Sequence, residues 1–314
     1  MKVKFWGVRG SLPTPISPEQ VQSKINAVVQ RIKVTDLKNN DTRQKFISIL
    51  PEWLYGTIGG STPCIEITTN NNQTIIIDCG SGMRMCGKNF TSEINKTYYI
   101  FLSHFHWDHI QGLPFFDPAF DQTSKLKFYS SFYNIKEYLE KQMSEPYFPV
   151  QMETSFTKKS DFIHIEENTV IPIVDNVTVM SKKMFHPGGS FSYSFSENKH
   201  KIIYASDVEL QQEDFEETNE NCNFFQDADV LLFDAQYTVE EAIKKENWGH
   251  SAFCYAIDFA IKWNISKLYL FHHEPSYDDK KLYSILELSR WYADYASKGK
   301  LEVDLAIENK EIKI

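Results

Sequence analysis

The stretch YYIFLSHFHWDH, residues 98–109, decides how this 314-residue sequence is interpreted. It begins as an apolar run rich in β-forming residues, and we expect a strand over Tyr98–Phe105. Three histidines and an aspartate then fall within six residues, where the strand gives way to a loop. Neutral imidazole and carboxylate groups are ligands that zinc, manganese and iron accept, so the stretch predicts a metal site. The four residues are His104, His106, Asp108 and His109.

Three further candidate ligands follow later strand-like runs. His186 comes after the run 177–185, Asp207 after the run 201–206, and His272 after the run 267–271. Sheet folds tend to place their sites at the carboxyl ends of strands. For each of these residues taken alone, an ordinary role in the core or at the surface is favoured over a role as a metal ligand. Together with the first four they predict ligands for two metal ions.

Composition excludes several other classes of protein. Apolar residues make up 42% of the chain, enough for a sizeable core, and the net charge of −9 disfavours a long nucleic-acid partner. The five cysteines are scattered without a CxxC pair, which argues against a disulfide framework or a cysteine zinc site. Neither a secretory signal nor an apolar run of membrane-spanning length is present, so a cytoplasmic location is expected.

The order of the elements predicts an α/β (α+β) fold. Strands dominate the first half and helices fall between later strands, which favours two stacked sheets with helices outside. We expect one domain, 1–314, and a strand pair that turns around Asn309 in the tail 301–314. Other expected strands are Lys2–Val8, Cys64–Thr69, Thr74–Cys79, Leu126–Ser130, Phe191–Phe195 and Val230–Asp234. Expected helices are Ile135–Met143, Val239–Glu246, Ser251–Trp263 and Asp279–Ser297.

Residues 16–55 are expected to form a helical insertion in this domain. Ser17 can cap a helix, Pro18 suits the first helical position, and Gln20 completes a capping box. Apolar residues then follow at helical spacing. An insertion of this kind could form a lid over a site, and nearby aromatic residues could either stack on a nucleobase or belong to the core. Those aromatic residues are Trp53, Tyr55, Tyr147 and Phe148.

The sequence His104-Phe-His106-Trp-Asp108-His109 resembles the HxHxDH motif of the metallo-β-lactamase superfamily. The resemblance implies a four-layer αβ/βα sandwich that binds two divalent metal ions, with zinc favoured over manganese or iron. It places His104, His106 and His186 on one metal, and Asp108, His109 and His272 on the other. Asp207 is expected to bridge them, because order and spacing favour it over Asp234. An aspartate at the position of Asp78 stabilises the ligand loop in that superfamily.

A second motif, Gly249-His250-Ser251, resembles the GHS/T element of the phosphodiesterase branch, which includes the endonuclease RNase Z. The resemblance implies that His250 faces the substrate phosphate, whereas a purely structural role would be to cap the following helix. Arg9, in a Gly-Val-Arg-Gly-Ser turn, is either a phosphate ligand or an ordinary turn residue. Asp108 and His250 are the expected catalytic residues.

The implied activity is hydrolysis of a small phosphodiester, such as a cyclic nucleotide, by a metal-bridged hydroxide. No long Gly/Lys-rich arm is present, and the chain is acidic, which disfavours tRNA. A tRNA 3′-processing endoribonuclease and a thioesterase or other esterase of the same fold remain the alternatives. Relatives of this kind often dimerise, so the resemblance leaves a homodimer open.

Overall fold

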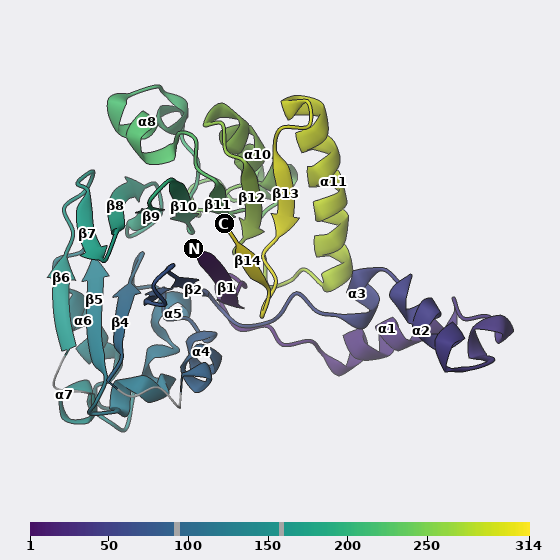
Figure 1. Ribbon diagram of the computed structural model, residues 1–314, viewed down its shortest axis with the longest axis horizontal. Helices are drawn as coiled ribbons and strands as arrows, with labels where there is room; N and C mark the ends of the chain where they lie inside the picture. Colours follow the sequence, from purple (N-terminus) through teal and green to yellow (C-terminus); the bar gives the residue numbers. More distant parts are fainter. Residues whose placement is uncertain (91–94, 157–159) are drawn as a thin grey trace.

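A computed structural model describes residues 1–90, 95–156 and 160–314, with two seven-stranded sheets at its centre (Figure 1). The first sheet contains β1 (Lys2–Gly7), β2 (Cys64–Thr68), β3 (Thr74–Ile77), β4 (Thr97–Phe101), β5 (Lys125–Ser130), β6 (Ser160–His164) and β14 (Glu311–Lys313). The second contains β7 (Ile171–Val174), β8 (Val177–Met184), β9 (Ser190–Glu197), β10 (His200–Ala205), β11 (Val230–Asp234), β12 (Lys267–Phe271) and β13 (Glu302–Leu305).

Both sheets change from antiparallel to parallel pairing along their width. The first has the order β14-β1-β2-β3-β4-β5-β6 and is parallel from β3 to β6. The second has the order β13-β12-β11-β10-β9-β8-β7 and is parallel from β10 to β13. Because parallel strands end at a common edge, the loops after β3 and β4 leave one edge of the first sheet. The loops after β10, β11 and β12 likewise leave one edge of the second.

Aromatic and β-branched side chains fill the space between the sheets. Phe101 of β4 is fully buried and packs edge-on against Phe195 of β9, with ring centroids 4.9 Å apart. It also stacks on Tyr129 of β5 at 4.7 Å. Burying a side chain of this size contributes roughly 1.5–3 kcal/mol, so such pairs hold the two sheets together.

Helices cover the outer face of each sheet and complete four layers. Apolar side chains of α4 (Met83–Asn89) and α6 (Ile135–Gln142) join a second buried cluster against the first sheet. On the second sheet, α10 (Phe253–Lys262) and α11 (Asp279–Ser297) take the same position. The expected αβ/βα sandwich is therefore confirmed. The remaining helices of the body are α5 (Trp107–Ile110), α7 (Met152–Ser155), α8 (Asn219–Phe225), α9 (Val239–Lys244), η2 (Leu113–Phe115), η3 (Asp117–Phe120) and η4 (Gln212–Phe215).

The predicted strand pair at the end of the chain is wrong. β13 pairs with β12 and β14 pairs with β1, so the two strands belong to different sheets. The segment between them crosses from one sheet to the other, with Ala306 donating to Leu270 and Asn309 donating to Phe5 through their backbones. Two strand-like runs separated by a turn residue such as asparagine are the usual sequence pattern of a hairpin. Here, however, each run pairs with the edge strand of a different sheet.

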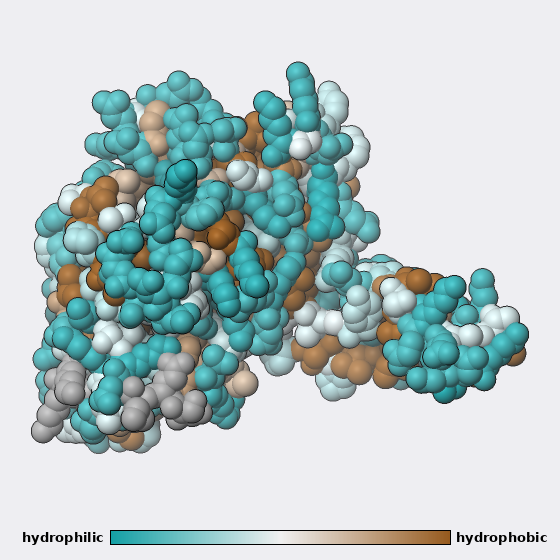
Figure 2. Space-filling view, viewed as in Figure 1, coloured by the Kyte–Doolittle hydropathy of each residue, from teal (hydrophilic) through white to brown (hydrophobic). Residues whose placement is uncertain are grey.

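Residues 16–55 form a helical projection from the body (Figure 1). The capping box predicted for its first helix is present, since the Ser17 hydroxyl accepts from the Gln20 amide at 3.2 Å and the Gln20 side chain accepts from the Ser17 amide at 2.9 Å. Figure 2 shows apolar side chains gathered on this projection, and an apolar groove of about 430 Å³ runs along its base. The helices are α1 (Pro18–Val29), η1 (Val34–Leu37), α2 (Asn40–Ser48) and α3 (Glu52–Tyr55). Within the described ranges, no helix has the length and apolar character needed to span a bilayer.

Candidate metal centre

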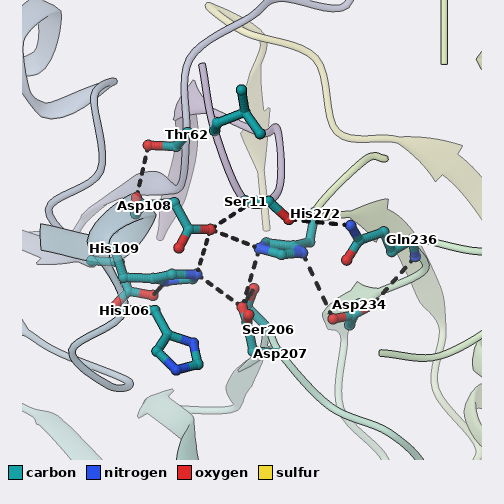
Figure 3. Close-up of polar contacts among 12 residues, drawn as sticks. Ser11, Thr62, His106, Asp108, His109, Ser206, Asp207, Asp234, Gln236 and His272 are labelled. Carbon is teal, nitrogen blue, oxygen red and sulfur yellow. Dashed lines mark hydrogen bonds and ion pairs between the residues drawn. The ribbon is translucent and has the colours of Figure 1, made fainter. Parts of the chain in front are cut away.

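All seven residues predicted as metal ligands converge at the edges of the two sheets. Figure 3 shows His106, Asp108, His109, Asp207 and His272 among them. They form two groups, and within each group one candidate ligand atom per residue lies within 4.8 Å of all the others. Asp207 belongs to both groups. The first contains His104, His106, His186 and Asp207, and the second contains Asp108, His109, Asp207 and His272.

The two oxygens of Asp207 point to different groups. Oδ1 lies 3.7 Å from Nε2 of both His104 and His186. Oδ2 lies 2.9 Å from Nε2 of His109 and 3.3 Å from Nε2 of His272. One carboxylate is thus placed to contribute an oxygen to each of two neighbouring ions.

Backbone conformation helps to place these side chains. Asp78 follows β3, Asp207 lies just after β10, and His272 follows β12, and their φ angles are 58°, 57° and 59°. Residues other than glycine are uncommon in this left-handed region, which costs on the order of 1–2 kcal/mol per residue. Three such residues, each just after the carboxyl end of a strand, mark a site where the packed sheets impose the geometry.

Hydrogen bonds fix the orientation of the histidine rings. Nδ1 of His109 lies 2.8 Å from an Asp78 oxygen, and Nδ1 of His186 lies 2.8 Å from the Gly249 carbonyl oxygen. Asp78 is fully buried and also accepts from the Ser103 amide and hydroxyl and from the Tyr204 hydroxyl. With Nδ1 held on the outside, Nε2 of each ring faces the cluster, as ligating histidines require.

Burial and neighbouring charge divide the histidines into two kinds. Burial lowers the pKa of His104, His106 and His186, which leaves neutral rings able to bind a metal. Burial also opposes protonation of His109, but Asp207, Asp108 and Asp78 outweigh it and raise its pKa. The second group therefore needs positive charge at its centre.

This donor set fits divalent metal ions. In the part of the chain that the structure describes, the buried Nε2 atom of His104 makes no hydrogen bond, and Nε2 of His109 faces only the carboxylates of Asp108 and Asp207. Buried polar atoms are normally paired, and these two point into clusters that contain the carboxylates of Asp108 and Asp207. A pair of cations would satisfy the nitrogens and offset the buried negative charge.

His250 lies beside the cluster and is paired with Asp234. Its Nδ1 is 2.7 Å from Asp234 Oδ2, and its ring stacks on that of His272 with centroids 5.0 Å apart. Burial opposes protonation of His250, but Asp234 outweighs burial and raises its pKa. Asp234 shares no group with Asp207 and instead forms a third group with His250 and His272.

Arg9 does not face the cluster, and its predicted contact with a substrate phosphate is not supported. The side chain is buried and donates to the carbonyl oxygens of Gly59, Glu274 and Tyr277 at 2.8–3.1 Å. Burial lowers its pKa despite the acidic groups around it. Arg9 ties its own loop to two others, a role that depends on distant backbone groups and has no local sequence signal.

An Arg9→Ala variant is expected to lose stability and keep its affinity for substrate. Removing the guanidinium leaves buried carbonyl groups without donors, at about 1–3 kcal/mol in the free energy of unfolding. Thermal unfolding and the KM for a phosphodiester measure the two effects, and the exposed Arg84→Ala is the control. If KM rises while the melting temperature stays unchanged, Arg9 contacts the substrate after all.

A cleft of about 420 Å³ opens over the cluster, and its lining differs from the aromatic residues proposed from sequence. Trp53 packs inside the projection, Tyr55 lines the apolar groove, and Phe148 packs against Phe115. The cleft is lined by Ser11, Phe105, His106, Trp107, Asp108, Asp207, His250 and His272. Ser11 and Trp107 were not predicted to line the site, and the Ser11 amide donates to Asp108 Oδ2 at 2.8 Å.

Comparisons with known proteins agree with this architecture. Residues 73–273 match the family described as the beta-lactamase superfamily domain. The chain is 25% identical over 293 residues to ribonuclease Z of Picrophilus torridus, which covers 82% of this chain and 94% of the relative. The metallo-β-lactamase fold protein YhfI of Bacillus subtilis has a TM-score of 0.64 at 16% identity, covering 99% of this chain and 98% of YhfI. The short form of human tRNase Z has a TM-score of 0.62 at 18% identity, covering 100% and 99%.

Proposed function

Since this chain belongs to the β-lactamase superfamily and has the metallo-β-lactamase fold, we propose that it is a two-metal phosphodiesterase acting on a small substrate such as a cyclic nucleotide. The placement of Asp207 between the two ligand groups carries the proposal, because it fits a pair of metal ions. The His250–Asp234 pair beside them favours phosphodiester chemistry, which needs a proton for the leaving oxygen.

The residues divide between the two metals as follows. His104, His106 and His186 would hold one ion, and Asp108, His109 and His272 the other, with Asp207 contributing to both. Nitrogen and oxygen ligands of this kind suit zinc, with manganese and iron as alternatives. When bound, such ions act as Lewis acids and make a coordinated water a nucleophile near neutral pH.

Side chains of the protein would donate and accept the protons that the reaction transfers. His250 carries a proton more readily than an ordinary histidine because Asp234 holds it, so it can donate to the leaving alkoxide. Asp108 belongs to the second ligand group and would accept a proton from the attacking water. The Ser11 amide keeps one Asp108 oxygen in place, which leaves the other oxygen available for that step.

The size of the cleft favours a small substrate. Its volume of about 420 Å³ is in the range of small-ligand sites, and no residue of 16–55 lines it. This supports a nucleotide-sized phosphodiester and argues against the projection acting as a lid.

A tRNA precursor is the second candidate substrate. The similarity to ribonuclease Z of Picrophilus torridus extends over most of both chains. The projection also carries six Lys or Arg against four Asp or Glu, in a chain whose net charge is −9. Positive charge on an extended element is what phosphate-backbone contacts require.

Metal analysis and a substrate panel on the same sample test the proposal. We expect about two metal ions per chain, turnover of bis(p-nitrophenyl) phosphate and a cyclic nucleotide, and loss of both activities after chelation. The melting temperature should fall on chelation, because the buried carboxylates lose their counter-charge. Cleavage of a tRNA precursor alone would select the second candidate. Thioester cleavage without phosphodiester turnover would refute both.

A further inference from the structure

Trp107 presents its indole to solvent at the mouth of the metal cleft. It lines the cleft, yet its side chain is 84% exposed. It stands between His106 and Asp108 at the start of α5, so its Cα is only about 3.8 Å from that of either residue. Phe105 adds a second aromatic ring to the same lining.

Other tryptophans of the chain show what an ordinary structural role looks like. Trp6 and Trp263 are buried, and their ring N–H groups donate to Glu66 and to the Asp214 carbonyl. Trp107 has neither burial nor packing of this kind, so it contributes little to the core. An apolar ring left exposed beside a reactive site is more simply explained by what binds there.

We propose that Trp107 is a stacking platform for a flat aromatic group, such as a nucleobase, carried by the phosphate ester in the cleft. This inference rests on the proposed function and narrows its substrate class. The cleft is large enough for a phosphate on the cluster and a ring at the mouth. Stacking tolerates different bases because every base has a π-face, so Trp107 would select for an aromatic group rather than for one base.

Binding measurements isolate the ring from the phosphate. Adenosine 5′-monophosphate and ribose 5-phosphate carry the same phosphorylated sugar and differ in the base. By calorimetry on the metal-loaded protein, we expect the nucleotide to bind about tenfold or more tightly than the sugar phosphate. Trp107→Ala should remove most of that difference, and Trp107→Phe should keep most of it.

Two controls separate stacking from disturbance of the neighbouring ligands. Trp291→Ala removes another exposed indole, 68% exposed, from α11 outside the cleft, and should leave both affinities unchanged. Metal content of each variant shows whether His106 and Asp108 are still in place.

The outcomes also distinguish this inference from the proposed reaction. The protein could prefer the nucleotide through Trp107 and yet show no phosphodiesterase activity. That result would support the stacking role of Trp107 and refute the proposed reaction. Equal binding of the two ligands by the wild type, or an equal loss of both in Trp107→Ala, would overturn the platform.

Discussion

An Asp207→Ala variant should lose most of its bound metal and about a thousandfold or more of its phosphodiesterase turnover. The reason is geometric, since Asp207 is common to both ligand groups and each of its oxygens faces a different one. Removing any other ligand weakens metal binding by one group, whereas removing Asp207 weakens metal binding by both. It also removes the negative charge that would offset the repulsion between two cations. Elemental analysis and steady-state kinetics on the same preparation measure the two losses.

A matched control for this variant is Asp214→Ala in η4. Asp214 is also buried and accepts from the Gln211 amide at 2.8 Å, but it belongs to neither ligand group. It should lower the melting temperature and keep the metal. Retention of two metal ions by Asp207→Ala would show that the bridging assignment is incorrect.

A His250→Ala variant should lose roughly 10²- to 10⁴-fold in kcat, the usual contribution of a positioned general acid, while its metal content stays unchanged. The His250 ring contacts the rings of His186 and His272, and the hydrogen bonds that orient His109 and His186 do not come from the His250 side chain. His200→Ala, at a half-exposed histidine on β10, is the control and should keep full activity. Full turnover in His250→Ala would remove the residue from the mechanism.

Asp234 gives the same assignment a pH signature. Its carboxylate raises the pKa of His250, so activity that needs protonated His250 is present below that raised pKa and declines as pH rises through it. In Asp234→Asn the pKa of His250 should fall, and the alkaline limb of kcat should move to lower pH. If the alkaline limb of kcat does not move in Asp234→Asn, a group other than His250 donates the proton.

The convergence of the candidate metal ligands was predictable because much of the cluster is local. His104, His106, Asp108 and His109 come from one short loop after a strand, and chemistry alone makes that combination unusual. The later residues His186, Asp207 and His272 were predictable only from strand ends and the family resemblance, because what brings them together is the stacking of two sheets.

Other parts of the site depend on contacts that no local pattern records. The Tyr204 hydroxyl reaches Asp78 across the core, 126 positions away in the chain, and Arg9 joins carbonyl groups from two distant loops. In the fold, β6 and β7 were not predicted. They are edge strands with half-exposed side chains, so they lack the alternation that a half-buried strand shows.

The left-handed backbone at Asp78, Asp207 and His272 implies a trade-off between stability and activity. Glycine would adopt these φ angles without strain, whereas aspartate and histidine, although they tolerate them better than most residues, do so at a small cost. Relief of strain at these positions would therefore favour the fold while removing a ligand or its support. A descendant released from selection for catalysis could drift toward such residues and gain stability, so the ligands persist here only while the chemistry is selected.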